Sequence, residues 1–350
     1  MRAAVSSLLE EVTHLPSLHQ RKVGSLLGAA VADAAARPLH WVYDTEELRE
    51  AIRSDREHPE FWPVSHSPFY SLETGDNSCY WDQAMAVMTA LTKHGFSYDK
   101  ICAELVAQLG PGSRYNMEAR QQLMQTRMRG NTFTPIKGKF LHGGMIKFLE
   151  NLEQGKKICG DPHIKETDGF CCSLPVAVKF AGQEGMVERV LKVTTTQSSW
   201  PVAVRHAVVA CKIIEAFVLD REEPIQTVAR EVEPNFPEIS RELEEVRKTL
   251  EVDHFTAVGR IFGRPCYNPG SFLGALHAVQ TSDSYQEAVR KTIIAGGCNC
   301  SRAFFIGNQE SCNSDVMRHF YSQEPCWGLN MVWREYPETG LTRLKTRKIF

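Results

Sequence analysis

The sequence predicts an all-α protein, because apolar residues recur at helical spacing in most segments of the chain. Few segments alternate apolar and polar residues over the length of a strand, which argues against an extended sheet. No motif recurs at the spacing of a solenoid, so we expect one helical domain over residues 20–307. A short amphipathic lead, residues 1–19, precedes it, and a divergent polar and finally basic tail, residues 308–350, follows.

The composition, with 43% hydrophobic and 23% charged residues, is typical of a globular protein. A net charge of -2 without a basic block gives no basis for binding nucleic acid or an anionic membrane. No apolar run approaches the roughly 20 residues of a transmembrane helix, and residues 1–20 lack the pattern of a signal peptide. The 11 cysteines are scattered and odd in number, so we expect free thiols and a cytoplasmic location.

The first strong helical segment covers residues 22–36. Small residues at Gly24, Gly28 and Ala32 share one face, which favours close packing against another helix. Asp33 lies inside this apolar run, and a buried carboxylate must be paired or hydrogen-bonded. We therefore expect Asp33 either to brace a neighbouring loop or to line a site.

Pro38 ends this helix, because proline lacks the backbone donor that a continuing helix needs. A short helix over residues 46–54 and a long loop over residues 58–76 come next. The loop is rich in proline and aromatic residues, and ordered loops of this length often flank functional sites. The remaining predicted helices cover residues 83–94, 98–109, 118–129, 145–153, 176–180, 185–195, 200–218, 223–232, 239–250, 272–279 and 285–295.

The stretch 294–307 is the most informative part of the chain. The pair Gly296-Gly297 breaks the preceding helix, because glycine adopts positive φ at no steric cost. Three small polar or sulfur-containing residues follow, and Ser301, a good N-cap residue, then opens a second apolar run. This arrangement directs side chains and free backbone N–H groups at one point of a concave site.

Two loops of this kind precede helices, at residues 77–82 and 297–301. In a helical protein such loops suit hard cations, which prefer clustered carboxylate and hydroxyl oxygens. The first loop offers only Asp82, with Asp76 beside it, and the second offers no carboxylate. Thiols do not favour Mg²⁺ or Ca²⁺. The pattern therefore indicates a metal site whose ligands have been lost.

Three motifs in order carry a resemblance to a known family. They are Gly24-Ser-Leu-Leu-Gly28 continuing to Asp33, Tyr80-Trp-Asp82-Gln83-Ala-Met85, and Gly296-Gly-Cys298-Asn-Cys300-Ser301. The chain resembles the ADP-ribosylglycohydrolases, and within them the branch of the J-crystallins and selenoprotein J. The resemblance covers roughly residues 20–307. It implies a single compact orthogonal bundle of helices and two Mg²⁺ ions between the second and third motifs, which position ADP-ribose for cleavage of its glycosidic bond.

Most of the metal ligands that the resemblance implies are absent. Tyr80 and Trp81 stand where the hydrolases carry Thr and Asp, and both aspartates of the third motif are cysteines, Cys298 and Cys300. Asp82 and Ser301 alone keep ligand-type oxygens, as a vestigial metal pair. We therefore expect no bound cofactor and a non-catalytic, crystallin-like structural protein. Residual hydrolysis or binding of ADP-ribose, or a related small molecule, is the first alternative.

A redox function is the second alternative. Cys298 lies in a glycine-rich loop before a helix, with Arg302 one turn further on, an arrangement that lowers the pKa of a thiol when it is exposed. Cys300 would be its resolving partner. Otherwise Cys298 is a small buried residue that remained after metal loss.

Two further segments are matched by the resemblance. Gln197 stands where many relatives carry His and is expected to line the cleft, and Asp168-Gly169 matches a family cleft segment. The predicted catalytic residues are Asp82, Cys298 and Cys300, and the predicted ligand-binding residues are Asp33, Asp76, Gln83, Gln197, Gly296, Gly297, Asn299, Ser301 and Arg302.

Overall fold

A computed structural model describes residue 12 and residues 14–310, and it confirms the all-α fold. The long helices are α2 (Ser17–Ala36), α4 (Cys79–His94), α5 (Tyr98–Leu109), α6 (Met117–Met128), α7 (Gly143–Glu153), α8 (Asp168–Lys179), α9 (Met186–Thr194), α10 (Pro201–Val218), α11 (Pro224–Val232), α12 (Pro237–Lys248), α14 (Gly270–Gln280), α15 (Tyr285–Ile294) and α16 (Asn299–Glu310). Shorter elements are η1 (Arg37–Leu39), α3 (Thr45–Ala51), α13 (His254–Thr256) and the π-helical turn η2 (Ala257–Phe262). Strands β1 (Tyr70–Ser71) and β2 (Ile136–Lys137) form a two-stranded parallel pair.

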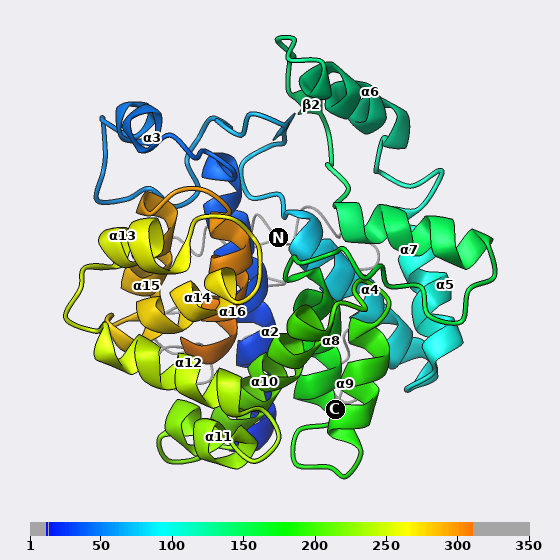
Figure 1. Cartoon of the computed structure of the whole chain (residues 1–350), viewed down its shortest axis with the longest axis vertical. Helices are drawn as coiled ribbons and strands as arrows, with labels where there is room; N and C mark the ends of the chain where they lie inside the picture. Colours follow the sequence, from blue (N-terminus) through cyan, green and yellow to red (C-terminus); the bar gives the residue numbers. More distant parts are fainter. Residues whose placement is uncertain (1–11, 13, 311–350) are drawn as a thin grey trace.

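Helices α2 and α16 form the centre of the molecule and pack against each other along their length (Figure 1). Their closest approach is at Gly28 and Gly307, where a Cβ added to Gly307 would lie 2.2 Å from the Gly28 carbonyl oxygen. Only glycine permits two backbones to approach so closely. The predicted role of the small residues of α2, close helix packing, is therefore what the structure shows.

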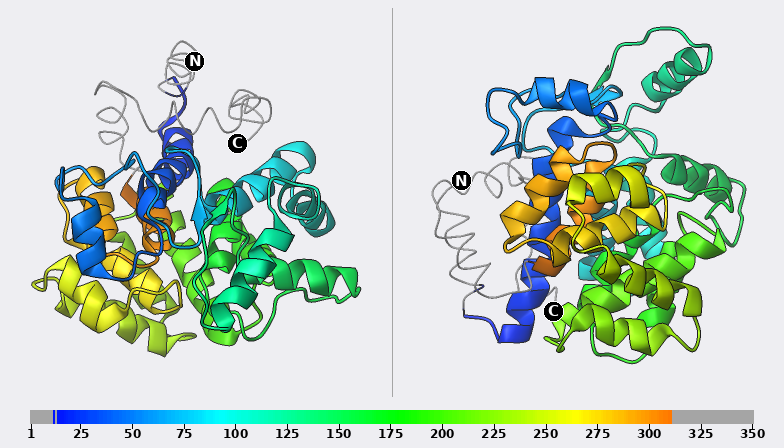
Figure 2. Two further views of the ribbon diagram at one scale, coloured as in Figure 1. Left: turned by 90° about the horizontal axis from the view of Figure 1, so that it is seen from above. Right: turned by 60° about the vertical axis from the view of Figure 1, so that its left-hand side comes forward.

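Two groups of helices flank this central pair. Helices α12 to α15 lie on one side of α2, and α4, α5, α7, α8 and α9 lie on the other (Figure 1). Helix α10 is buried between α8 and α11, as its apolar sequence predicts. Helix α6 projects away from the body of the bundle in the views of Figures 1 and 2.

Helix α2 begins at Ser17, five residues before the predicted start, and two further predicted helix boundaries are wrong. The segment predicted as 176–180 is the end of a longer helix, α8, which begins at Asp168 and includes Pro175. Residues 168–178 are almost wholly buried, and tertiary packing outweighs the unfavourable proline. Ser301 does not cap α16, because that helix begins at Asn299 and the Ser301 hydroxyl donates to the Cys298 carbonyl oxygen at 2.8 Å.

The predicted lead, 1–19, and tail, 308–350, lie mainly outside the described residues, so their boundaries stay predictions. All nine cysteines within the described part are free thiols. Within that part, no helix combines the length and the apolar character needed to cross a membrane.

Candidate functional site

A pocket of about 500 Å³ opens beside the N-termini of α4, α7 and α8. Aromatic rings form much of its wall, and arginines from α6 and carboxylates near α8 supply opposite charges. Its lining residues are Trp41, Tyr43, Phe69, Tyr80, Arg120, Met124, Arg127, Phe140, His142, Gly143, Glu166, Asp168, Pro265, Cys266 and Tyr267. A pocket of this size and chemistry is typical of a small-molecule site.

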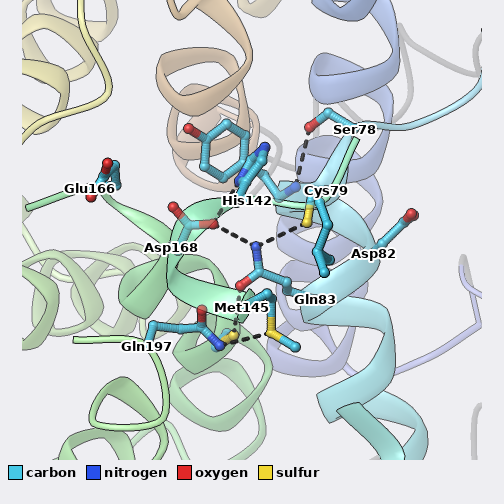
Figure 3. A network of polar contacts seen from close by, with 12 residues as sticks. Ser78, Cys79, Asp82, Gln83, His142, Met145, Glu166, Asp168 and Gln197 are labelled. Carbon is cyan, nitrogen blue, oxygen red and sulfur yellow. Dashed lines mark hydrogen bonds and ion pairs between the residues drawn. The ribbon is translucent and has the colours of Figure 1, made fainter. Parts of the chain in front are cut away.

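A buried polar network lies at the inner end of the pocket (Figure 3). The Asp168 Oδ1 atom lies 2.6 Å from His142 Nδ1 and accepts a hydrogen bond of 2.6 Å from Gln83 Nε2. Burial alone would lower the pKa of His142, but the charge and hydrogen bond of Asp168 raise it. The second oxygen of Asp168, Oδ2, is buried and has no hydrogen-bond partner among the described residues, although Asp168 lines the pocket.

Glu166, from the loop before α8, also lines the pocket. Burial raises the pKa of its carboxyl group, and the nearby charge of Asp168 raises it further. The inner end of the pocket is therefore rich in acceptors and prefers a ligand that donates hydrogen bonds.

Asp82 lies outside this network and points away from Gln83 and Asp168 (Figure 3). Its carboxylate faces the buried ammonium of Lys139, with an Nζ–Oδ2 distance of 3.1 Å, and it also accepts a hydrogen bond from the Tyr115 hydroxyl. The Lys139 ammonium donates a second hydrogen bond of 2.7 Å to the Asn77 carbonyl oxygen. The single carboxylate that the resemblance assigns to magnesium is thus paired with a protein cation.

Asp33 braces the loop that leads into α4. Its carboxylate accepts from the Ser78 backbone N–H at 2.7 Å, from the Ser78 hydroxyl at 2.5 Å and from Asn77 Nδ2 at 3.1 Å. Burial raises the pKa of Asp33 to about 6, although these hydrogen bonds act to lower it. Of the two expectations for Asp33, bracing a loop is the one that these contacts describe.

The glycine pair before α16 is held in a left-handed conformation, with φ of +72° at Gly296 and +67° at Gly297. A Cβ on Gly297 would lie 2.5 Å from Arg264 Cβ, so glycine is required there by space as well as by φ. Arg302 is wholly buried and donates from Nε to Thr292 Oγ1 at 3.0 Å and from Nη1 to the Arg264 carbonyl oxygen at 3.2 Å. Burial lowers the pKa of its guanidinium to about 10. Arg302 thus stabilises the glycine loop before α16 through buried hydrogen bonds.

The thiol of Cys298 lies between two ring-bearing side chains. Its Sγ is 3.2 Å from His40 Nε2 and 3.2 Å from the Tyr80 hydroxyl. Burial acts to raise the pKa of Cys298, but hydrogen bonds from Cys266 and His40 outweigh it and leave the pKa well below the ordinary value. The sulfur of Cys300 points elsewhere, toward the Asp33 carbonyl oxygen at 3.8 Å. Cys298 is wholly buried, so this arrangement does not provide the exposed thiol that the redox hypothesis requires.

The remaining predicted residues are dispersed around the pocket. Gln197 is wholly buried, and its Nε2 contacts Met145 Sδ at 3.0 Å. The Asp76 backbone carbonyl accepts from Arg37 Nε at 3.2 Å, and Asn299 Nδ2 donates to the Leu39 carbonyl oxygen at 3.1 Å.

None of the residues predicted as catalytic or ligand-binding lines the pocket. Asp168, which the resemblance matched to a family cleft segment, does line it, and so does Tyr80 of the second motif. Sequence reasoning missed Trp41, Arg120, His142 and Glu166. The signal that was available for His142 is its position before Gly143-Gly144 at a helix start.

The residues present do not fit the paired magnesium ions that the resemblance implies. Mg²⁺ needs oxygen ligands at about 2.0–2.1 Å in octahedral geometry. Asp82 is engaged by Lys139 and Tyr115, and the Ser301 hydroxyl is engaged by Ser271 Oγ at 2.8 Å and by the Cys298 carbonyl. In the described part of the chain, no three His, Cys, Asp or Glu side chains are placed to hold a metal ion.

Comparison with known proteins agrees with the fold and the motifs. The sequence profile of the ADP-ribosylglycohydrolase family matches residues 14–309, so the chain belongs to that family. It is 31% identical to crystallin J1A and 27% identical to crystallin J1B of Tripedalia cystophora, in each case over 82% of this chain and 85% of the relative. A solved structure described as an ADP-ribosylglycohydrolase-related protein complex superimposes with a TM-score of 0.57 at 15% identity, covering 91% of this chain and 99% of that one, and this likeness concerns the fold alone.

Proposed function

We propose that this protein is a non-catalytic, crystallin-like member of its family, in which contacts between protein groups have replaced the dinuclear magnesium centre. The contact between Tyr80 and Cys298, at 3.2 Å, carries this proposal. By the resemblance these positions belong to a Thr of the second motif and an Asp of the third. Here the two side chains contact each other, both are wholly buried, and neither can offer a carboxylate to a dication.

Calorimetry and a cleavage assay test the loss of the centre. We expect calorimetry with ADP-ribose to give the same result in excess Mg²⁺ and in EDTA. We also expect no release of ADP-ribose from ADP-ribosyl-arginine in either condition. Cleavage that depends on Mg²⁺, or a tenfold gain in affinity on adding Mg²⁺, would contradict the proposal.

Binding of ADP-ribose or a related small molecule is the second function that we propose, and it is compatible with the first. The unpartnered Asp168 Oδ2, on a side chain that is 1% exposed, favours it. A buried acceptor without a donor costs about 1–3 kcal/mol, and a ligand hydroxyl or N–H would remove that cost. The aromatic walls suit a base or sugar ring, and Arg120 and Arg127 suit a phosphate.

The variant Asp168→Asn separates this function from the first. An amide has one acceptor oxygen, which the network already occupies, and an NH2 donor in place of the second carboxylate oxygen. We therefore expect ADP-ribose affinity to fall at least about tenfold, the equivalent of one hydrogen bond to a charged group. Asp161→Asn, away from the pocket lining, is the control. Equal ADP-ribose affinity in wild type and Asp168→Asn would show that the pocket network takes no part in ligand recognition.

A further inference from the structure

Lys139 is a buried cation in a part of the fold where none is expected from its sequence context. It is 3% exposed, and burying an ammonium costs several kcal/mol unless the charge is compensated. Two oxygen groups compensate it, the Asn77 carbonyl at 2.7 Å and the Asp82 carboxylate at 3.1 Å and 3.4 Å. Both belong to the segment that ends the loop before α4 and starts that helix.

The distances between the Lys139 ammonium and these oxygens are ordinary for a lysine. Values of 2.7–3.4 Å are those of N–H···O hydrogen bonds and ion pairs from an ammonium. Magnesium would require the same oxygens at about 2.0–2.1 Å and further ligands to complete an octahedron. An ammonium donates three hydrogen bonds from one point and needs no octahedron. The geometry of the oxygens around Asp82 is therefore that of a lysine ammonium site.

Lys139 also lies directly before residues that line the pocket. It follows strand β2 and precedes helix α7, and the residues directly after it, Phe140, His142 and Gly143, line the pocket. The helix to which it is tied, α4, contributes Tyr80 to the same pocket. The ammonium therefore joins two pocket walls that are about 60 residues apart in sequence.

We propose that Lys139 is a positioning residue that acts as an internal cation. Its ammonium holds the 139–143 segment against the start of α4 and so orders the pocket without a divalent ion. This inference rests on the proposed loss of the magnesium centre and adds the group that has taken over the organising function. Lys139 contacts Asp82 and Asn77, not the pocket ligand itself.

Chemical rescue provides the test. In Lys139→Ala we expect amide hydrogen exchange of Asp82 and Ile146, whose N–H groups donate to the carbonyl oxygens of residues 78 and 142, to accelerate at least about tenfold, the equivalent of losing one buried charged contact. Ethylammonium at tens of millimolar should restore most of the protection, because it supplies an ammonium and two of the three missing carbons. Tetramethylammonium should not, because it has a charge but no N–H donor. Lys137→Ala, on exposed β2, is the control and should exchange like wild type.

A second variant keeps the test decisive if the alanine variant does not fold. Lys139→Met retains the volume of the side chain and loses only the charge and the donors, and it should show the same faster exchange. Unchanged exchange in the methionine variant, or equal rescue by tetramethylammonium, would overturn the role of the ammonium. If Mg²⁺ in place of ethylammonium restored the protection, a metal site would be retained and the proposed function would be contradicted as well. If ADP-ribose binding by wild type depends on Mg²⁺ while ethylammonium still restores protection in Lys139→Ala, only the proposed function is contradicted.

Discussion

The pH dependence of stability follows from Asp33, whose carboxyl has a pKa of about 6 in the folded protein against 3.8 for an ordinary aspartate. Burial is the main cause, and the hydrogen bonds from Ser78 and Asn77 only partly offset it. A raised pKa means that the folded state binds the proton more tightly than the unfolded state. The stabilisation due to protonated Asp33 is therefore complete below about pH 4 and is lost as the pH rises through about 6.

The magnitude comes from the size of the shift. About 2.2 pKa units at 1.36 kcal/mol each give about 3 kcal/mol in the free energy of unfolding between the two limits. We expect Asp33→Asn to lose this dependence, because an amide does not titrate. Most of this range lies between pH 4 and pH 7.5, so the difference in unfolding free energy between Asp33→Asn and wild type should shift by about 2.4 kcal/mol in favour of the variant over that span.

Guanidinium chloride unfolding at closely spaced pH values measures this difference. The variant Ser78→Ala supplies a control of opposite design, because it removes the hydroxyl that donates to Asp33 and keeps the carboxyl. It should raise the pKa further and extend the pH-dependent range upward. A constant difference between Asp33→Asn and wild type from pH 4 to 7.5 would refute the argument and indicate that Asp33 titrates as an ordinary carboxyl.

Two further substitutions test the packing and the pocket network. Gly307→Ala places a methyl group 2.2 Å from the Gly28 carbonyl oxygen, so the free energy of unfolding should fall by about 3 kcal/mol in denaturant titrations, and a loss below 1 kcal/mol would show that α16 can shift away. Asp168→Asn removes the charge that raises the pKa of His142, so NMR titration of the imidazole should show a lower pKa than in wild type, while an unchanged value would assign the shift to another group.

Much of the fold was predictable from local patterns. Apolar periodicity and glycine or proline breaks are properties of short segments, and they located most helices to within a few residues. The beginning of α8 was not predictable, because Asp168 to Pro175 form a helix only through burial against α4 and α10. The small residues of α2 predicted close packing, but their partner, Gly307, is almost 280 residues away and is recognisable only in three dimensions.

The site was less accessible to sequence reasoning, for a physical reason. Asp82 could be recognised from its motif, but its partner Lys139 lies in a polar loop without periodicity, 57 residues further on. A lysine in such a loop is most often solvated. His142 and Glu166 also lie beside helix starts, and only tertiary structure brings them to one pocket with Asp168. Sequence motifs marked the positions where this chain departs from the ligands that the resemblance implies, but not the contacts that its side chains make there.

Groups at the positions that the resemblance assigns to the metal ligands contact one another. The Tyr80 hydroxyl lies 3.2 Å from the Cys298 sulfur across the two motifs. Trp81 is wholly buried, and its indole Nε1 has no hydrogen-bond partner among the described residues. Lys139 supplies Asp82 with the positive charge that a dication would otherwise provide. Restoring a single aspartate at Cys298 would therefore bury a second carboxylate against His40 and Tyr80 without creating a magnesium site.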